Sequence, residues 1–430
     1  MVFKVAIAGL GVVGGGTAKL LTEHKDLLEK RCNRAMELTA VADVNEDRFR
    51  ALNLPVSVSY YKDALEMVEK ADADLVVELI GGADGIALTL CKKALESGKH
   101  YVTANKAMLA RHGNELGALA ERKGVFFGYE ASVGGGIPVI KVLREGFVGN
   151  DISAVYGILN GTCNYILTKM RETKRPFADV LAEAQELGYA EKPDPSLDVD
   201  GVDTAHKTAI LGALAFGMPV DFQKMHVEGI RHISDLDIAY ADELGYRIKL
   251  LGIAKNINGA VCINVYPCMV PQTAALATVD GVFNAVTTEG DFVGRSVLIG
   301  RGAGEKPTAS AVVSDIVDCA TGRGLPFLTV PFDKAEKRCQ IPLSERIGGY
   351  YLRFDVRDEA GVVADIARAL GDEGVSIERM IQRSVDGRDT VPLIMTVHEA
   401  KEAAVTKALT VIRSLKAVAG EPCMIRIEKL

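Results

Sequence analysis

The first twenty residues constrain the fold more than any other part of the chain. The segment FKVAIAGLGVVGGGTAKLL is typical of an apolar strand, a turn with glycines in G-x-G-x-x-G spacing, and a helix with small residues. Glycines at this spacing let a pyrophosphate approach backbone amides at a helix N-terminus, where the helix dipole favours negative charge. In this context the motif favours a nicotinamide dinucleotide over a structural turn. The residues expected to contact the dinucleotide are Gly9, Leu10, Gly11, Val12, Val13 and Gly14.

Strand-like and helix-like segments alternate through residues 1–136, which predicts an α/β fold with a doubly wound, Rossmann-type parallel sheet. The carboxyl ends of such strands face the nucleotide. Asp43 ends the second expected strand and is a candidate for the acid that binds the adenosine ribose; Ala104 and Lys106 follow a later strand at the same edge. An Asp here favours NAD, but the nearby Arg48 and Arg50 could accept a 2'-phosphate, so NAD and NADP both stay open.

Residues 188–207, GYAEKPDPSLDVDGVDTAHK, gather acidic side chains before a lysine. The prolines predict an exposed loop over residues 191–198, and TAHKTAILGALAF predicts a helix that Asp200 is placed to cap. In that helix Asp203 and Lys207 lie four residues apart on one face. Such pairs are common on solvated surfaces. The almost uncharged run after Lys207 instead indicates a buried helix, which favours a functional lysine.

The same stretch resembles the signature of the homoserine dehydrogenase family. The matching residues, in the order that family uses, are the GYAE run at 188–191, Asp194 and Pro195, Asp198, Gly201, Asp203 and Lys207. The likeness covers essentially the whole chain: GILNGTCNYIL at 157–167 is similar to the family's G-I-x-N-G-T-x-N-Y-I-L motif. The TANK run ending at Lys106 is similar to a family motif whose lysine contacts cofactor and substrate.

The resemblance implies an NAD(P)-dependent interconversion of L-homoserine and L-aspartate 4-semialdehyde in threonine, methionine and isoleucine biosynthesis. Reducing an aldehyde needs a proton donor at the carbonyl oxygen, and a lysine whose pKa is lowered by burial can donate near neutrality. Lys207 is the first choice for this donor and Lys106 the second, with Asp203 orienting the reacting end or its water. The expected substrate residues are Gly161, Thr162, Tyr189, Glu191, Asp198 and Asp203, and Gly188 and Gly304 join the cofactor residues.

A glycine-rich turn, VGGGIPVI, follows Glu130. Dense glycines expose backbone carbonyls, and one acid with several carbonyls suits a hard cation, although a tight turn is an equal alternative. The family resemblance implies a sodium ion at Glu130, Val133, Gly135 and Ile137.

Three units are expected. Residues 1–136 bind the nucleotide, completed by about 305–325, and residues 137–304 form an α+β catalytic and dimerisation domain with a mixed sheet. Beyond a proline-marked boundary, residues 346–430 have the ferredoxin-like order strand, helix, strand, strand, helix, strand. With DEAGVVADIA after its first strand, this tail resembles an ACT domain, a separate regulatory module that receives an amino acid such as threonine near Gly361. A plain dimerisation module is the alternative.

Composition narrows the remaining classes. The net charge of −7 comes without a basic block, which argues against nucleic acid, and no apolar run reaches membrane-span length. Eight scattered cysteines without a C-x-x-C pair suggest reduced core thiols. The lack of a membrane-length run predicts a cytoplasmic location, and a homodimer or homotetramer is expected. A nucleophilic Cys163 would indicate an aspartate-semialdehyde dehydrogenase, but no paired histidine is near it. Another Rossmann dehydrogenase of amino acids and a non-catalytic amino-acid sensor remain as alternatives.

Overall fold

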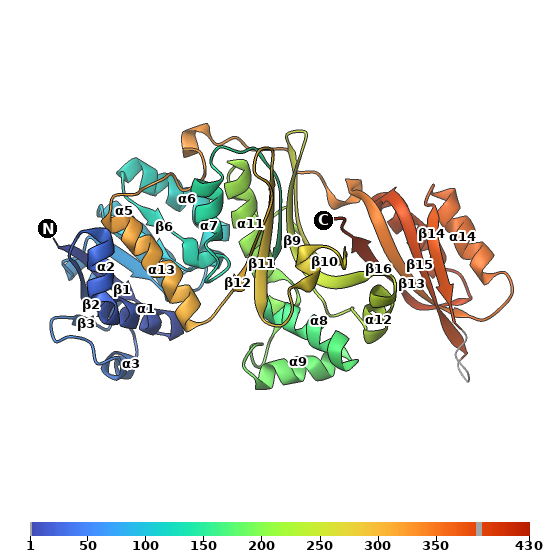
Figure 1. The fold of residues 1–430 in the computed structure, drawn as a ribbon, viewed down its shortest axis with the longest axis horizontal. Coiled ribbons are helices and arrows are strands. Elements are labelled where there is room, and N and C mark those ends of the chain that lie inside the picture. The colour runs from blue at the N-terminus through green and yellow to red at the C-terminus, as the bar shows by residue number, and fades with distance from the viewer. Residues whose placement is uncertain (1, 384–388) are drawn as a thin grey trace.

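The computed structural model describes residues 2–383 and 389–430 (Figure 1). The apolar segments near the N-terminus form a six-stranded parallel sheet of order β3-β2-β1-β4-β5-β6, which confirms the doubly wound prediction. Side chains alternate along a strand, so in β1 Val5 and Ile7 enter one core cluster and Ala6 and Ala8 another. The strands are β1 (Phe3–Ala8), β2 (Met36–Ala42), β3 (Ser59–Tyr61), β4 (Leu75–Glu78), β5 (His100–Thr103) and β6 (Phe127–Gly128).

Helices cover both faces of this first sheet. The core on one face is formed with α1, α2 and α13, and the core on the other with α4, α5 and α6. Because α13 comes from much later in the sequence, the chain returns to the first sheet after building only part of the second, and then adds β13 to β16 to the second sheet (Figure 1). The bounds are α1 (Val12–Glu23), α2 (Lys25–Cys32), α3 (Glu46–Ala51), α4 (Ala64–Lys70), α5 (Ile86–Glu96), α6 (Lys106–Lys123) and α13 (Glu305–Ala320).

The second sheet has ten strands in the order β12-β11-β7-β9-β10-β16-β13-β15-β14, with β8 paired to β10. It is mixed, since β8 and β16 run parallel to β10 while the other pairs are antiparallel. The strands are β7 (Ile152–Ile158), β8 (His226–Val227), β9 (Tyr246–Ile257), β10 (Ala260–Pro271), β11 (Phe283–Gly290), β12 (Gly294–Arg301), β13 (Ile347–Arg357), β14 (Ile377–Gln382), β15 (Thr390–Lys401) and β16 (Val418–Ile427).

Helices between these strands carry the acidic stretch of the sequence. The residues over 188–207 form a loop, one short helix and the start of a long helix. The bounds are α7 (Val139–Lys141), α8 (Gly161–Thr173), α9 (Phe177–Glu186), α10 (Ser196–Val199), α11 (Val202–Phe216), α12 (Asp235–Glu243), α14 (Val362–Asp372) and α15 (Glu402–Arg413), with short helical turns at Glu130–Ser132, Val142–Gly146, Ala275–Thr278, Phe332–Lys334 and Leu343–Glu345.

The C-terminal segment has the ferredoxin-like order and its own apolar core, as predicted, but it is not separate. β16 pairs with β10 through Cys268 and Met269, so one sheet runs from the catalytic part into the tail. Asp237 of α12 is 0% exposed and accepts hydrogen bonds from the Tyr351 hydroxyl at 3.0 Å and Arg353 Nε at 2.7 Å. Paired backbone and a buried ion pair therefore fix the tail to the catalytic part.

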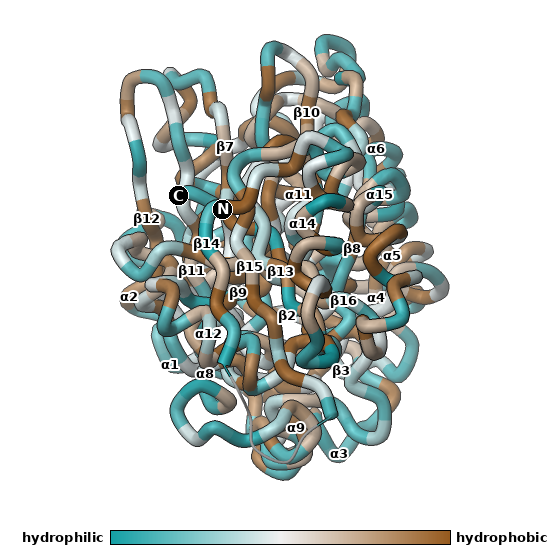
Figure 2. Tube along the Cα trace, turned by 90° about the vertical axis from the view of Figure 1, so that its right-hand side faces the viewer, coloured by the Kyte–Doolittle hydropathy of each residue, from teal (hydrophilic) through white to brown (hydrophobic). Residues whose placement is uncertain are grey.

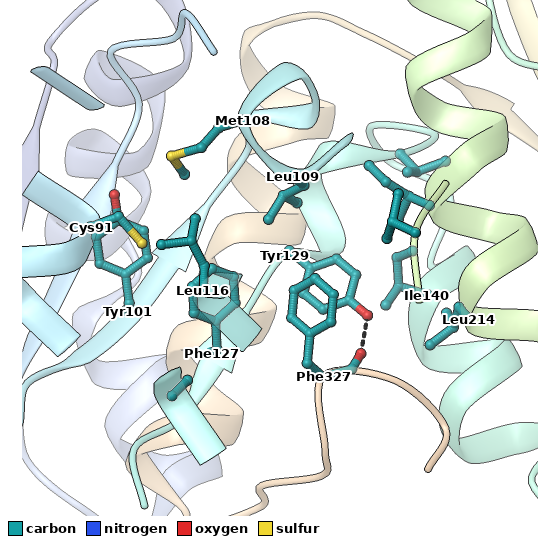
Figure 3. Packing of buried hydrophobic residues seen from close by; sticks show 14 of the residues in the cluster. Cys91, Tyr101, Met108, Leu109, Leu116, Phe127, Tyr129, Ile140, Leu214 and Phe327 are labelled. Carbon is teal, nitrogen blue, oxygen red and sulfur yellow. Dashed lines mark hydrogen bonds between the residues drawn. The ribbon is translucent and has the colours of Figure 1, made fainter. Parts of the chain in front are cut away.

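The chain between α13 and the tail lies against the first sheet. The ring of Phe327 stacks on Tyr129 with centroids 4.6 Å apart, and the Tyr129 hydroxyl donates to the Phe327 carbonyl (Figure 3). Hydrophobic stretches gather in the middle of the molecule and much of the periphery is hydrophilic (Figure 2). All eight cysteines are free thiols; seven are buried, but Cys339 in this connection is exposed, contrary to the expectation of core thiols throughout.

Candidate functional site

Lys207 lies on the buried face of α11, as its uncharged surroundings predict. The residue is only 8% exposed. Its Nζ donates to Oδ2 of Asp203 at 2.7 Å and to the carbonyl oxygen of Leu159 at 2.7 Å. A lysine ammonium has three N–H donors. Two are therefore used within the described residues, and one remains for a ligand.

Lys106 reaches the same carboxylate from the other sheet. It is the first residue of α6, and its Nζ lies 3.2 Å from Oδ1 of Asp203. The Lys106 side chain is 40% exposed, far more than that of Lys207. Asp203 thus joins a lysine that follows β5 of the first sheet to a second lysine on α11.

Burial and charge shift the pKa values of these groups in opposite directions. Burial lowers the pKa of Lys207, and the Asp203 carboxylate offsets only part of this effect. For Asp203, burial raises the pKa, but Lys207 and Lys106 lower it more, so this carboxyl stays ionised well below its usual range. Burial raises the pKa of Asp198, although a hydrogen bond from Asn160 opposes the shift.

Asn160, which lies in the GILNGTCNYIL motif, belongs to this cluster although it was not among the expected site residues. It caps α8, because its Oδ1 accepts a hydrogen bond from the Cys163 amide at 2.8 Å. Its Nδ2 donates to Oδ1 of Asp198 at 2.7 Å and to Oδ2 of Asp203 at 2.9 Å. One amide group therefore touches two acids of the expected site.

The expected substrate residues surround this cluster. The Thr162 hydroxyl donates to the Tyr189 carbonyl at 2.6 Å, and the Tyr189 ring packs edge-on against Tyr165. A side chain on Gly161 would lie 2.9 Å from the Val282 carbonyl oxygen, which explains the glycine. Glu191 is exposed, and its carboxylate has no hydrogen bond or ion pair within the part of the chain that the structure describes.

Two local expectations for this stretch are wrong. Asp198 belongs to the short helix α10 rather than to an open loop. Asp200 does not cap α11: Gly201 holds the N-cap position in a left-handed conformation, φ +86°, and Asp200 pairs with Arg231 instead. Glycine suits this position because the left-handed conformation is costly for residues with a side chain, and a Cβ there would lie 3.3 Å from the Glu228 carbonyl oxygen.

The glycine-rich turn has the geometry of a nucleotide site. Gly9 has φ +92°, and a side chain there would lie 2.6 Å from the Leu79 carbonyl oxygen. A side chain on Gly14 would lie 1.8 Å from the Gly9 carbonyl oxygen, whereas one on Gly11 would meet nothing within 4 Å. The N-terminus of α1 has no side-chain cap. Gly11 therefore leaves open space beside free amides, which fits a pyrophosphate.

Asp43 holds this turn in place. Its carboxylate accepts hydrogen bonds from the amides of Leu10 at 2.6 Å and Asn45 at 2.8 Å. Burial raises its pKa, but these bonds and the nearby Arg48 lower it more, so the carboxyl is ionised. Of the other expected cofactor residues, Ala104 immediately precedes the cap of α6, and Gly188 and Gly304 have φ values of +76° and +116°.

The side chains around Glu130 fit the expected metal site less well than those of the glycine-rich turn fit a nucleotide. Both carboxylate oxygens of Glu130 accept backbone hydrogen bonds, from Ile140 at 3.0 Å and Lys141 at 2.8 Å. Burial and the charge of Asp315 raise the pKa of Glu130 to about 8. No group of three or more His, Cys, Asp or Glu side chains that could hold a metal occurs among the described residues. A cation at this turn would therefore depend on backbone carbonyl oxygens, including those of Val133, Gly135 and Ile137.

Comparison with known proteins decides the family. Residues 138–317 match the model described as "Homoserine dehydrogenase", residues 9–130 its NAD-binding domain, and residues 350–417 the ACT domain. A homoserine dehydrogenase of Neisseria gonorrhoeae is 43% identical over 99% of both chains. The chain belongs to the homoserine dehydrogenase family. It is an NAD(P)-dependent oxidoreductase that interconverts L-homoserine and L-aspartate 4-semialdehyde. This finding excludes the two alternatives, another Rossmann dehydrogenase of amino acids and a non-catalytic amino-acid sensor.

Other relatives agree in sequence and fold. The homoserine dehydrogenase of Pseudomonas aeruginosa is 42% identical over 99% of both chains. A crystal structure of a homoserine dehydrogenase from Thiobacillus denitrificans aligns with a TM-score of 0.93 and 41% identity, covering 100% of this chain and 99% of that one. A hyperthermophilic archaeal homoserine dehydrogenase solved with NADPH is 28% identical with a TM-score of 0.64, and covers 76% of this chain and 100% of its own.

Proposed function

We propose that Lys207 is the proton donor in the homoserine dehydrogenase reaction. Bound NAD(P)H supplies a hydride to the carbonyl carbon of the semialdehyde, and the carbonyl oxygen must gain a proton. The observation that carries the proposal is a buried ammonium, held by Asp203 and Leu159, with one N–H left over. Burial lowers the pKa of Lys207, which makes it a better acid near neutrality, and the same amine accepts the hydroxyl proton in homoserine oxidation.

Lys106 is the second candidate. It faces the same carboxylate from α6, but its side chain is 40% exposed and so is far less buried than that of Lys207. We assign it contact with both cofactor and substrate at the junction of the two sheets. The test is a comparison of Lys207→Ala and Lys106→Ala in homoserine-dependent NAD(P) reduction. We expect Lys207→Ala to lower kcat by about 100-fold or more with little change in cofactor affinity. A near wild-type rate would refute the assignment of Lys207.

We propose that Glu191 and Asp198 bind the substrate ammonium. The Glu191 carboxylate is exposed and has no partner among the described residues, and Asp198 follows it in the same acidic stretch of the chain. Asp203 orients the reacting end or its water, and Gly161, Thr162 and Tyr189 shape the remaining wall. Two carboxylates suit a cationic amino group, which a neutral pocket would bind less tightly.

The proposed cofactor residues are the turn from Gly9 to Gly14, Asp43, Ala104, Lys106, Gly188 and Gly304. The carboxylate of Asp43 lies 3.3 Å from Arg48 Nη1, so an acid for a ribose hydroxyl and a cation for a 2'-phosphate stand side by side. For this reason the proposal keeps both NAD and NADP. Parallel titrations of the two nucleotides against the purified enzyme decide between them.

The remaining proposals concern ions, partners and setting. A sodium ion at residues 130–137 is proposed from the family resemblance and is supported by the two left-handed glycines of that turn, Gly134 and Gly135. Melting curves in sodium chloride and in choline chloride test it. We further propose threonine as the ACT ligand, a homodimer or homotetramer, a cytoplasmic location, and units at 1–136 with 305–325, 137–304 and 346–430. Among the described residues, no helix is long and apolar enough to cross a membrane.

A further inference from the structure

Asn160 uses both of its amide protons and its carbonyl oxygen for hydrogen bonds at the acidic cluster. The residue is 6% exposed and links the end of β7 to α8. Its two amide protons go to Asp198 at 2.7 Å and Asp203 at 2.9 Å, and its oxygen accepts from the Cys163 amide. The partners belong to three different helices: α10, α11 and α8. One side chain therefore fixes the spacing of two acids that are not otherwise bonded to each other.

The two acids have unequal support. Asp203 also faces Lys207 and Lys106. The Asp198 carboxylate has no ion pair among the described residues, and the amide of Asn160 is the one hydrogen-bond donor found for it there. A partly buried carboxylate that lacks a protein hydrogen-bond donor takes up a proton more readily. The Asn160 amide therefore favours the ionised form of Asp198 and fixes its orientation beside a second negative charge.

We infer that Asn160 is a positioning residue for homoserine binding, acting through Asp198 and Asp203. This inference rests on the proposed function, in which Asp198 binds the substrate ammonium. The preceding residue, Leu159, also helps to position the site, since its carbonyl oxygen accepts a hydrogen bond from Lys207 at 2.7 Å. A segment of two residues at the end of β7 thus sets the places of the proton donor and both acids.

The choice of side chain separates this role from helix capping. An N-cap needs only an oxygen acceptor, and serine or aspartate caps a helix about as well as asparagine. Serine offers one donor and ionised aspartate none, whereas the amide of asparagine offers two. Capping alone would not select asparagine here; donation to two carboxylates does.

The test is Asn160→Ser, which keeps a cap acceptor but cannot bond both acids. We expect a melting temperature near that of the wild type, a KM for homoserine raised about 10-fold or more, and a KM for the nucleotide changed less than about 2-fold. The acidic limb of kcat/KM for homoserine oxidation should move to higher pH, because Asp198 loses the bond that lowers its pKa. Asn45→Ser is the matched control, since Asn45 caps α3 away from the acids.

An unchanged homoserine KM and pH profile in Asn160→Ser would overturn the inference and leave Asn160 as a cap. If that variant melts below the assay temperature, Asn160→Asp decides: it keeps the acceptor and the shape, removes both donors, and should lose more kcat/KM at neutral pH. Asp198→Asn is measured beside them. If Asp198→Asn leaves the homoserine KM unchanged, both the proposed role of Asp198 and the inference about Asn160 are wrong. If Asp198→Asn raises KM and the Asn160 variants do not, the inference alone fails.

Discussion

Lys106 Nζ lies 3.2 Å from Oδ1 of Asp203, and this pair spans the two sheets of the molecule. Lys106 is the first residue of α6, at the carboxyl edge of the first sheet. Asp203 lies in the first turn of α11, which packs against the second sheet. The other oxygen of the carboxylate accepts from Lys207. Asp203 is therefore placed to favour the charged form of Lys207. Its contact with Lys106 links this ion pair to the first sheet.

The first prediction follows from this carboxylate. In Asp203→Asn, burial still lowers the pKa of Lys207, but the charge that raises it is gone, so the pKa falls further. An acid must be protonated to act, so aldehyde reduction is lost as pH rises through the pKa of Lys207. The basic limb of the reduction profile should thus shift to lower pH by about one unit, which lowers kcat/KM on that limb by about 10-fold.

The control for this change is Asp200→Asn. Asp200 lies in the same stretch but pairs with Arg231. Its loss should leave the basic limb where it is. A basic limb that stays fixed in Asp203→Asn would show that Lys207 does not supply the proton.

A second prediction concerns Glu191. Glu191→Gln keeps the shape and removes the charge, so the KM for homoserine should rise by about 10-fold while the KM for the nucleotide changes little. Steady-state kinetics with each substrate varied in turn measures both. Glu186→Gln, an exposed residue at the end of α9, is the matched control. Equal increases in both constants would instead assign Glu191 to the structure of its loop.

Local periodicity predicted much of this site. The spacing of Asp203 and Lys207 and the uncharged run after them gave both the ion pair and the burial of the lysine, since both follow from one helix. The strand-turn-helix motif likewise gave the first sheet. These features depend on neighbours within a few residues, where helical and strand periods are reliable guides.

Contacts between segments far apart in the chain could not be predicted from the sequence. The acids bonded to Asn160 lie 38 and 43 residues further along, so no local pattern shows them. The available signal was the asparagine of the G-I-x-N-G-T-like motif, a residue type that both caps and donates. The pairing of β10 with β16 was missed for the same reason, because a break at prolines marks a linker but says nothing of what packs beyond it.

The third prediction is the stability of a shortened chain. A chain ending at residue 340 loses Tyr351, Ile425 and Ile427 from a core shared with Ile238, and Asp237 loses its cation partner. We expect its melting temperature to fall by about 5 °C or more, since even about 2 kcal/mol shifts a domain of this size by several degrees. Thermal unfolding followed by circular dichroism measures this. An unchanged melting temperature would mean that the tail is separable after all.

The last prediction concerns control by the tail. Gly361 caps α14 with φ +97° and free space around it, a place where backbone amides can receive an amino acid. Binding there changes activity only if it favours one arrangement of the catalytic part, with a typical coupling of about 1 to 3 kcal/mol. One side chain connects the tail with the catalytic part. Arg426 of β16 pairs with Glu402 of α15 at 2.7 Å and with Glu228, which follows β8 of the catalytic part, at 2.7 Å.

Threonine should therefore raise the melting temperature of the full-length enzyme and change its homoserine kinetics. Arg426→Lys keeps the charge but lacks the fork that bonds two carboxylates at once. In this variant threonine should still raise the melting temperature, while its effect on kcat/KM for homoserine shrinks by about 5-fold or more. Lys429→Arg, at an exposed ion pair with Glu399, serves as the control. If threonine and related amino acids alter neither melting nor activity of the wild type, the tail is a structural or dimerisation module. If Arg426→Lys responds as the wild type does, the coupling between the tail and the substrate residues takes another route.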